Sequence, residues 1–351
     1  MMKQQTLDKN LGFALVLSED ENLTSSQRIK VTEKEIPILK KGQVLIKVLA
    51  SPVNPSDLVY LLGKYGLPPQ DNAYCGFEGV GIVVEANAGL YGKWLKGKRV
   101  AISAQPGIDG VWAKYAITKA NFCLPVRDDI SDEQAATLIV NPCTSVCMVE
   151  RAKALGTNTI VINAAASQVG KGVIRYAKLL GMKTIATVRS QANVEVLKGL
   201  GADFVLNTMD ENFDEHLKSI TYENKAKVLL DAVAADDTPR VLKAMPKGST
   251  AIVYGRLTET HDPIGGRFSV ADVIFRDIKI EGFWLATYIG NAKPWHVLAL
   301  SKKVQRLFAS GVFKTDIYAA VGFTGFADAI DHYADNKSDG KVILLPQQDS
   351  L

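Results

Sequence analysis

A turn of small residues between a strand and a helix is the part of this sequence best suited to chemistry. The apolar run 159–162 predicts a buried strand, and apolar residues at helical spacing from Val169 to Leu180 predict a helix. Such a turn makes a phosphate site, because free backbone N–H groups point at the ligand and small side chains let it approach. The predicted cofactor contacts here are Ala166, Ser167, Gln168, Val169 and Gly170.

The usual fingerprint of such a turn, G-x-G-x-x-G, keeps only Gly170 in this chain, so an ordinary crossover helix would fit the same residues. The second β-branched run, 184–188, is more informative because of the residue that follows it. An NAD site needs Asp or Glu there, roughly 20 residues past the motif, to bind the ribose 2′-hydroxyl. This chain has Arg189, a cation that suits a 2′-phosphate. The sequence therefore predicts NADPH rather than NADH, the alternative for Arg189 being a solvated strand end.

The elements that must position these residues form a regular series after about residue 140. Six short apolar runs alternate with helical patterns, which predicts an α/β fold with a doubly wound parallel sheet of six strands. The runs are 160–162, 185–188, 204–206, 228–230, 251–254 and 278–282. Ligands bind at the carboxyl ends of such strands. We therefore add Tyr254, Gly255, Arg256, Phe283 and Trp284 to the predicted cofactor contacts, although Arg256 could reach only solvent and aromatic residues at strand ends are more often core.

The first 125 residues or so differ, because their many short alternating runs predict a mostly β module. Ser131 with Gln134 three residues later marks a helix start, and a long helix follows from about Pro142 to Leu155. The tail, with a helix over 326–333 and a strand over 341–345, is expected to return and complete the β module. The predicted domains are 1–138 with 286–351, and 139–285.

Composition excludes several classes of function. The 351 residues are 47% hydrophobic and 22% charged, as in soluble globular proteins, and the net charge of +4 without a long basic cluster argues against nucleic acid. No apolar run reaches the ~18 residues of a membrane span, so no membrane partner is expected. The N-terminal residues have no signal or transit pattern, so we expect a cytoplasmic protein. The four cysteines lack metal-ligand spacing and are expected to be small buried thiols.

The layout of a β-rich module, an inserted nucleotide domain and a C-terminal return resembles the medium-chain dehydrogenase/reductase superfamily. The resemblance implies a Rossmann domain inserted in a GroES-like catalytic domain. The zinc alcohol dehydrogenases of that superfamily have three catalytic ligands where this chain has Asn54, Phe77 and about Val140. Because three protein ligands are needed to hold catalytic zinc, we expect no metal. The zinc-free branch of the superfamily reduces polarised C=C bonds or quinones.

Within that branch, several segments resemble the 2-enoyl thioester reductases of mitochondrial and bacterial type. They are 54–57 with 63–67, 140–144, 163–170 and 274–285, of which the last is the most specific. Two positions depart from the pattern of those reductases. Gln191 stands where they have a second arginine, and Gly76-Phe77-Glu78 has the form seen in quinone reductases.

The resemblance implies roles for individual residues. Tyr65 would be the catalytic acid or carbonyl-polarising group and Asn54 would line the substrate pocket, both grouped here as catalytic. Thr144 would bind the nicotinamide amide, and Lys341 is counted among the cofactor contacts. From the residues alone, Tyr65 could instead pack under its loop, Thr144 could be a plain first-turn residue, and Asn54 could only form the turn before a proline.

The expected function is therefore NADPH-dependent, zinc-independent reduction of an activated C=C bond by hydride transfer. The substrate would be an α,β-unsaturated carbonyl compound, with 2-enoyl thioesters as the example that the resemblance offers. One alternative is an NADPH:quinone oxidoreductase on the same scaffold, and another is an NADPH-binding protein without turnover. A homodimer is expected by analogy with the same family.

Overall fold

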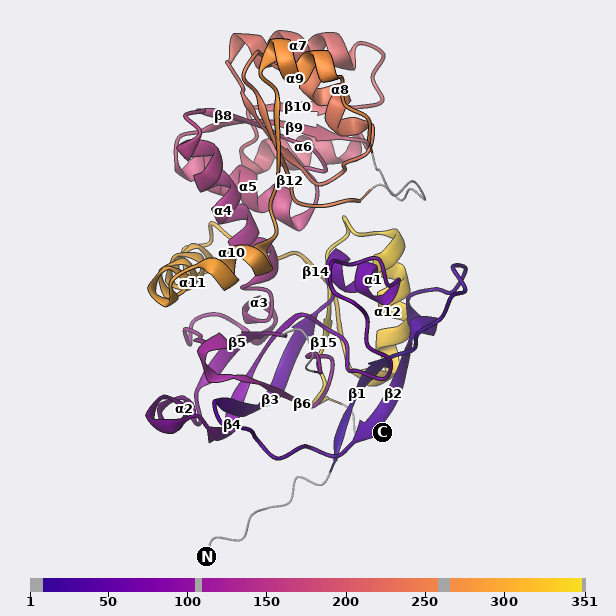
Figure 1. The fold of residues 1–351 in the computed structure, drawn as a ribbon, viewed down its shortest axis with the longest axis vertical. Coiled ribbons are helices and arrows are strands. Elements are labelled where there is room, and N and C mark those ends of the chain that lie inside the picture. Colours follow the sequence, from indigo (N-terminus) through magenta and orange to yellow (C-terminus); the bar gives the residue numbers. More distant parts are fainter. Residues whose placement is uncertain (1–8, 105–108, 258–265, 349–351) are drawn as a thin grey trace, which may run out of the picture. The chain divides into compact units, whose positions relative to one another are not determined.

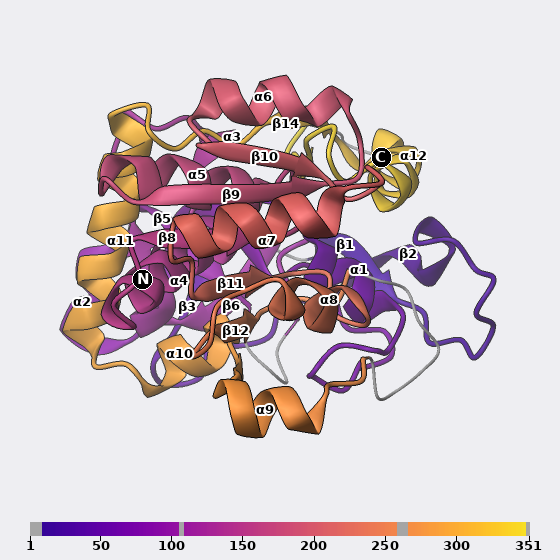
Figure 2. The same cartoon turned by 90° about the horizontal axis from the view of Figure 1, so that it is seen from above.

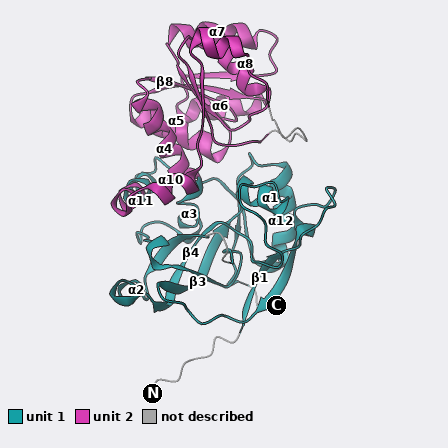
Figure 3. Cartoon of the chain, in the orientation of Figure 1, with its two compact units in different colours: residues 1–140, 301–351 teal, residues 141–300 magenta. Residues whose placement is uncertain are grey.

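A computed structural model describes residues 9–104, 109–257 and 266–348 of the chain (Figure 1). The chain divides into two compact units, one of residues 1–140 with 301–351 and one of residues 141–300 (Figure 3). The structure divides the chain after residues 140 and 300, whereas the sequence-based prediction placed the domain boundaries after residues 138 and 285. The later division falls inside helix α11 (Pro294–Ala309).

The unit of residues 141–300 is built on a parallel sheet, which among its described residues has six strands in the order β10-β9-β8-β11-β12-β13. The predicted doubly wound sheet is confirmed. The order reverses between β8 and β11, so the carboxyl ends of these two strands mark the switch point where such sheets bind ligands. The strands are β8 (Thr159–Ile162), β9 (Lys183–Val188), β10 (Phe204–Asn207), β11 (Val228–Asp231), β12 (Thr250–Val253) and β13 (Lys279–Gly282).

Helices cover both faces of this sheet. Helix α5 packs on α6, and α7 packs on α8; Figure 2 shows α6 and α7 on opposite sides of strands β9 and β10. The inner strands β8, β9, β11 and β12 are almost entirely buried, which explains why each appears in the sequence as a largely apolar run, whereas the edge strands β10 and β13 are partly buried and mostly exposed, respectively. The helices are α4 (Val140–Ala154), α5 (Gln168–Leu179), α6 (Ala192–Leu200), α7 (Phe213–Glu223), α8 (Asp237–Lys243), α9 (Val270–Arg276) and α10 (Leu285–Asn291).

The other unit is mostly β, as predicted. In its described part, a sheet of seven strands has the order β14-β15-β3-β4-β5-β7, with β6 paired to β3, and β1 pairs with β2 separately. The strands are β1 (Asn10–Leu15), β2 (Ile29–Lys34), β3 (Gln43–Pro52), β4 (Glu78–Asn87), β5 (Arg99–Ser103), β6 (Tyr115–Lys119), β7 (Cys123–Pro125), β14 (Ile317–Val321) and β15 (Lys341–Leu344). The helices are η1 (Ser26–Arg28), α1 (Pro55–Leu61), α2 (Gly89–Leu95), η2 (Ala120–Phe122), α3 (Asp132–Ala135) and α12 (Phe323–Asp335).

The C-terminal segment completes this β unit, which confirms the predicted return of the tail. Strand β15 pairs antiparallel with the end of β3 and parallel with β14. Helix α12 brings Phe326 against Phe13 and Trp112, with ring centroids 4.8 and 5.0 Å apart. A side chain at Gly76, which has φ +92°, would come within 2.4 Å of the Trp112 ring, so this position requires glycine.

The described helices include none that is both long and apolar enough to cross a membrane.

Candidate active site

The predicted phosphate turn has the local structure that the sequence indicates. Strand β8 ends at Ile162, and the turn leads into α5, whose N-cap is Ser167. The Ser167 hydroxyl oxygen accepts a hydrogen bond from the Gly170 amide at 3.1 Å. A Cβ atom at Gly170 would lie 2.4 Å from the carbonyl oxygen of Ala165, so the helix can approach the turn this closely only with glycine there. Of the three glycines in the usual fingerprint, the chain thus retains only Gly170, the one that the close packing of α5 on the turn requires.

Asn163, at the end of β8, ties this turn to the neighbouring strand β11. Its side-chain amide nitrogen donates to Asp231 at 2.5 Å and to Asp237 at 2.9 Å, and its oxygen accepts from the Ala232 amide at 2.8 Å. Asn163 is 1% exposed, so its three side-chain hydrogen bonds lie in the interior of the protein. The network fixes the two loops at the switch point of the sheet relative to each other.

Asp231 organises the loop after β11, and the sequence analysis did not identify it. This buried carboxylate accepts from the amides of Val233 and Ala234 at 2.9 Å each and from the Thr238 hydroxyl. The same loop holds Ala234 and Ala235 at φ +61° and +52°, a conformation that non-glycine residues rarely adopt. Such strain gathers at functional sites. The only sequence signal was an aspartate that ends an apolar run.

Tyr254, Gly255 and Arg256 follow β12, as predicted, and lie at the same edge of the sheet. The Tyr254 amide donates to the Asp231 carbonyl at 2.9 Å, and Gly255 approaches Ala232 so closely that a Cβ atom would lie 3.1 Å from its carbonyl oxygen. The Tyr254 hydroxyl is buried and lies near the side chain of Ser167, the N-cap of α5. Burial raises the pKa of Tyr254 and the interaction with Ser167 acts in the opposite direction, so this hydroxyl remains a neutral donor. The phosphate turn therefore has a buried phenol beside it.

Arg189 stands directly after β9, whose parallel neighbour is β8. Its side chain is exposed, and no carboxylate of the described residues forms an ion pair with it. It is therefore placed at the same edge as the phosphate turn, one strand away. The residues at this edge fit a dinucleotide: a turn of small residues, a helix N-terminus, a buried donor and a cation one strand along.

Thr144 lies deeper in its helix than the sequence analysis placed it. Helix α4 begins at Val140 rather than Pro142, because the helical turns start before the proline, and Thr144 is thus its fifth residue and is buried. The neighbouring Ser145 donates its hydroxyl to the Val169 carbonyl at 3.0 Å, which joins α4 to the first turn of α5.

Phe283 and Trp284 follow β13 as predicted. The Phe283 amide donates to the Val253 carbonyl at 2.8 Å, and its ring lies 5.7 Å from that of Tyr288. Trp284 is 39% exposed and precedes α10. Neither aromatic belongs to the buried core of the described residues.

The two residues predicted to be catalytic, Asn54 and Tyr65, lie in the β unit, and they differ from each other in burial. Asn54, the N-cap of α1, has no exposed surface. Its amide nitrogen donates to Glu78 at 2.9 Å, and its amide oxygen accepts from Lys341 at 2.6 Å. The structure thus shows Asn54 using both ends of its side chain inside the protein, and not lining a pocket as expected.

Lys341 is the buried cation of this group. Its ammonium donates to the Val53 carbonyl at 2.8 Å, to Asn54 at 2.6 Å and to the Tyr333 hydroxyl at 3.1 Å. An ammonium has three donors, so a contact with a cofactor, as the sequence analysis expected, would have to replace one of these bonds. Burial lowers the pKa of Lys341, while the nearby Glu78 and Asp57 oppose that shift.

Glu78, which the sequence analysis left without a role, connects this group to helix α4. Beside Asn54, its carboxylate accepts from the amides of Ile139 and Val140 at 3.1 and 2.8 Å. Val140 is the first residue of α4, so Glu78 places negative charge at the positive end of the helix. Burial raises the pKa of Glu78, and the hydrogen bonds it accepts act in the opposite direction.

Tyr65 lies in the loop after α1, where its partly exposed ring packs on Phe77 at 5.1 Å between centroids. Tyr60 packs on the same Phe77 at 5.3 Å, but its hydroxyl accepts a hydrogen bond from the Gln70 amide at 3.2 Å. Phe77 is in turn fixed by its amide, which donates to Asp57 at 2.9 Å. The Tyr60 hydroxyl thus accepts a hydrogen bond from the backbone of its own loop, and the Tyr65 ring contacts Phe77.

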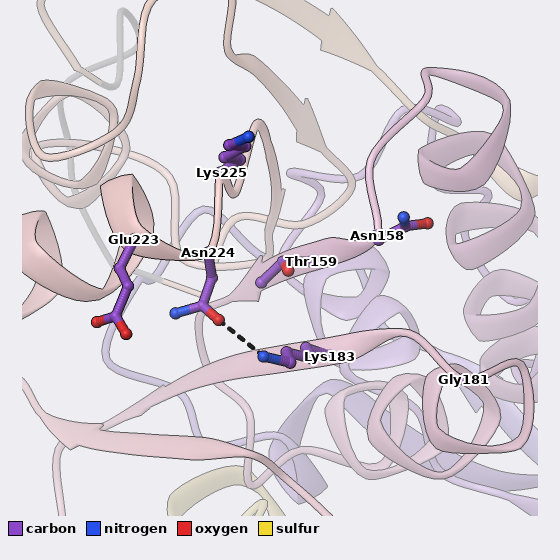
Figure 4. A pocket seen from close by; sticks show the side chains of 7 residues that line it. All are labelled: Asn158, Thr159, Gly181, Lys183, Glu223, Asn224 and Lys225. Atoms are coloured by element: carbon purple, nitrogen blue, oxygen red, sulfur yellow. Dashed lines mark hydrogen bonds between the residues drawn. The ribbon is translucent and has the colours of Figure 1, made fainter.

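Two other groups of residues lie apart from this chemistry. The four cysteines are free and buried, as expected, and no cluster of three or more His, Cys, Asp or Glu within the described ranges could hold a metal ion. A hollow of about 420 Å³ lies at the amino ends of β8 and β9, where Lys183 donates to Asn224 at 3.0 Å (Figure 4). It faces the opposite edge of the sheet from the phosphate turn, and no predicted site residue lines it.

Comparisons with known proteins agree with this geometry. Residues 40–128 match the alcohol dehydrogenase GroES-like domain, and residues 169–302 match the family described as zinc-binding dehydrogenase. The mitochondrial enoyl-[acyl-carrier-protein] reductase of Rattus norvegicus is 31% identical over 308 residues, 86% of this chain and 81% of that protein.

Two solved structures show the same fold. One, a candidate NADPH:quinone reductase from Mesorhizobium loti, has a TM-score of 0.86 and 32% identity over 96% of this chain and 98% of its own. The other, a mitochondrial 2-enoyl thioester reductase heterodimer from Candida tropicalis, has a TM-score of 0.78 and 20% identity over 96% and 99%. The chain therefore belongs to the medium-chain dehydrogenase/reductase superfamily and is an oxidoreductase.

Proposed function

We propose that this protein is an NADPH-dependent, zinc-independent reductase of activated C=C bonds, with 2-enoyl thioesters as its substrate class. The observation that carries the proposal is Phe77. By the resemblance stated above, Phe77 stands where the zinc alcohol dehydrogenases have a zinc ligand, and its ring packs against that of Tyr65 with 5.1 Å between centroids. The proposed site thus uses the Tyr65 phenol, in place of a Lewis acid, to polarise the substrate carbonyl. The enoyl reductase name of the curated relative agrees with this chemistry.

The choice of NADPH rests on Arg189. A guanidinium directly after β9 suits a 2′-phosphate, whereas an NAD site needs a carboxylate there. The amides at the start of α5 would hold the pyrophosphate, with Gly170 allowing the close approach. The reductase from Mesorhizobium loti is named for the same cofactor.

In the proposed reaction, bound NADPH supplies a hydride to the β carbon of the substrate. Negative charge would then develop on the carbonyl oxygen, where the Tyr65 phenol donates a hydrogen bond to it. A proton that comes ultimately from solvent would reach the α carbon and complete the reduction. A phenol suits this task because it is a neutral donor at pH 7. Glu78, Asn54 and Lys341 take no part in proton transfer in this account; they fix the backbone from which α1 and the Tyr65 loop start.

The substitution Tyr65→Phe tests the role of the phenol. We expect kcat/KM for a trans-2-enoyl thioester to fall about 100-fold, as for loss of one oxyanion donor, with unchanged NADPH binding by fluorescence titration. Tyr60→Phe is the matched control, since its hydroxyl serves only the loop, and it is expected to keep thioester turnover. Unchanged turnover in Tyr65→Phe would remove Tyr65 from the mechanism.

The second candidate function is NADPH:quinone oxidoreduction, which the quinone-reductase form of Gly76-Phe77-Glu78 and the name of the Mesorhizobium loti protein favour. Hydride transfer to a quinone gives a hydroquinone anion whose charge the aromatic ring delocalises, so quinone reduction depends less on the Tyr65 phenol and should largely survive Tyr65→Phe. An enzyme that reduces quinones, but no enoyl thioester, would therefore have this function instead.

We further infer that the protein forms a homodimer through the unit of residues 141–300. Strand β13 pairs only with β12 among the described residues, which leaves one sheet edge open, and neither α9 nor α10 buries a residue. Large exposed apolar side chains gather around this edge: Val270, Val273, Ile274, Phe275, Ile280, Trp284 and Tyr288. A second copy that pairs along β13 would cover both the open edge and these side chains.

A further inference from the structure

Three segments of the β unit, distant in sequence, form one continuous surface. They are residues 38–42, 86–98 and 119–122, and we call this surface the lysine–aromatic face. The Gly42 amide donates to the Asn87 carbonyl at 2.7 Å, the Asn87 side chain donates to the Leu39 carbonyl at 2.9 Å, and the Ala120 amide donates to the Gly42 carbonyl at 2.9 Å. These bonds hold the turn before β3, helix α2 and helix η2 side by side.

The charge of this face has one sign. Its segments contain no aspartate or glutamate, and no carboxylate of the described residues forms an ion pair with any of its lysines. Lys98 instead lies over the Trp94 ring, 4.5 Å from its centroid. The lysines are Lys40, Lys41, Lys93, Lys96, Lys98 and Lys119. Because they come from three segments, the sequence shows no basic cluster.

Large apolar side chains project from the same face. Ile38 is 94% exposed and Leu90 is 86% exposed, which is unusual for aliphatic residues of this size. Tyr91 and Trp94 are also exposed, and their rings stack at 5.6 Å. Exposed aliphatic and aromatic residues among lysines are typical of surfaces that lie at the boundary of a lipid bilayer.

The position of the face separates it from the residues of the proposed chemistry. It lies where β3 begins and β4 ends, whereas Asn54 and Glu78 lie where β3 ends and β4 begins. Strand β3 runs from Gln43 to Pro52, which corresponds to about 30 Å. A partner on this face would therefore not cover Asn54 or Glu78. This disfavours an acidic carrier protein that delivers a substrate, and it favours a partner that only anchors the enzyme.

We propose that the lysine–aromatic face binds the surface of an anionic lipid bilayer. Ile38, Leu90 and Trp94 would enter the boundary between headgroups and acyl chains, and the lysines would lie among the anionic headgroups. The sequence led us to expect no membrane partner because it contains no spanning segment. Surface binding needs no such segment, and it is independent of the reaction proposed above.

The test is flotation of the full-length protein with vesicles of phosphatidylcholine alone or mixed with phosphatidylserine. We expect binding only to vesicles that contain phosphatidylserine, and release at high salt. The triple variant K41Q/K93Q/K96Q should bind about 100-fold more weakly, since each lysine contributes about five-fold. The control K218Q/K227Q/K247Q removes the same charge from exposed positions in the other unit and should bind like the wild type.

A second variant separates the apolar contribution from the charge. I38S/L90S replaces two exposed side chains, so it should fold normally and keep its enzymatic turnover, yet lose most vesicle binding. Three outcomes would overturn the proposal: no binding of the wild type to anionic vesicles, equal binding to neutral ones, or equal weakening by the control triple variant. Retention on immobilised polyglutamate without vesicle binding would assign the face to an acidic protein instead.

Discussion

At the residue scale, the most informative side chain outside the predicted set is Glu78. Its carboxylate accepts hydrogen bonds from the amides of Ile139 and Val140 and from the side chain of Asn54, whose other end is occupied by Lys341. Each carboxylate oxygen of Glu78 therefore has at least one donor facing it. A neutral amide at this position could not accept on both sides.

This arrangement predicts that Glu78→Gln is destabilising although it barely changes shape. One NH₂ group would face another donor in the interior, so we expect a loss of about 3 kcal/mol in the free energy of unfolding by urea denaturation. Glu85→Gln, at an exposed position of the same strand β4, is the control and should change stability by less than about 0.5 kcal/mol. Equal stability of both variants would show that the buried hydrogen bonds contribute little.

The same group predicts a pH dependence. Burial raises the pKa of Glu78 above its usual 4.5. Between 4.5 and the raised value the native state holds more protons than the unfolded chain, so the contribution of Glu78 to stability falls as pH rises through that window. The slope of unfolding free energy against pH should therefore differ between Glu78→Gln and the wild type in that range.

Sequence alone predicted some site residues and missed others for a physical reason. The phosphate turn and Arg189 follow from local patterns, because strand, turn and helix are neighbours along the chain. Glu78 and Asp231 act through contacts between distant segments. Glu78 lies 62 positions from Val140, whose amide donates to it, and Asp231 lies 68 positions from Asn163. Only the fold shows which polar residues meet in the interior.

At the scale of elements, the approach of α5 to the end of β8 decides whether the turn can hold a phosphate. The helix comes so close at Gly170 that a Cβ atom would lie 2.4 Å from the Ala165 carbonyl oxygen. The first two glycines of the usual fingerprint are replaced by Ala165 and Ser167, and Ser167 gains an N-cap hydrogen bond in return. The sequence match is weak, but the geometry of the turn is preserved.

Gly170→Ala should therefore push α5 away from the turn. We expect a loss of at least about 2 kcal/mol in stability, measured by thermal unfolding, and a large increase in the Kd for NADPH. Gly199→Ala is the control, because Gly199 is also helical but has no atom within 4 Å of its would-be Cβ. That variant should be neutral or more stable by roughly 0.5 kcal/mol. Normal NADPH binding in Gly170→Ala would contradict the close approach.

At the scale of the whole molecule, the sequence predicted the β module, the six-stranded sheet and the return of the C-terminal segment. It could not show which apolar residues stay exposed. Residues 268–288 illustrate this, because their many apolar side chains suggest a buried segment, whereas helix α9 within it has no buried residue. Surfaces assembled from distant segments, such as the lysine–aromatic face, were invisible for the same reason.

The exposed residues around β13 predict the oligomeric state. Ile274→Asp with Phe275→Asp should convert the dimer to a monomer in sedimentation velocity, since two carboxylates would be buried without partners. Met209→Asp, at another exposed apolar position of the same unit, should leave the dimer intact. A wild-type protein that sediments as a monomer at micromolar concentration would exclude this interface.

The initial rate of NADPH oxidation at 340 nm distinguishes reduction of an activated C=C bond from reduction of a quinone. It would be measured with a trans-2-enoyl thioester, with a simple quinone, and with NADH in place of NADPH. We expect fast thioester reduction with NADPH and a much lower kcat/KM with NADH, because Arg189 favours the 2′-phosphate. Turnover with the quinone alone would contradict the proposed C=C chemistry, and a preference for NADH would contradict the role given to Arg189.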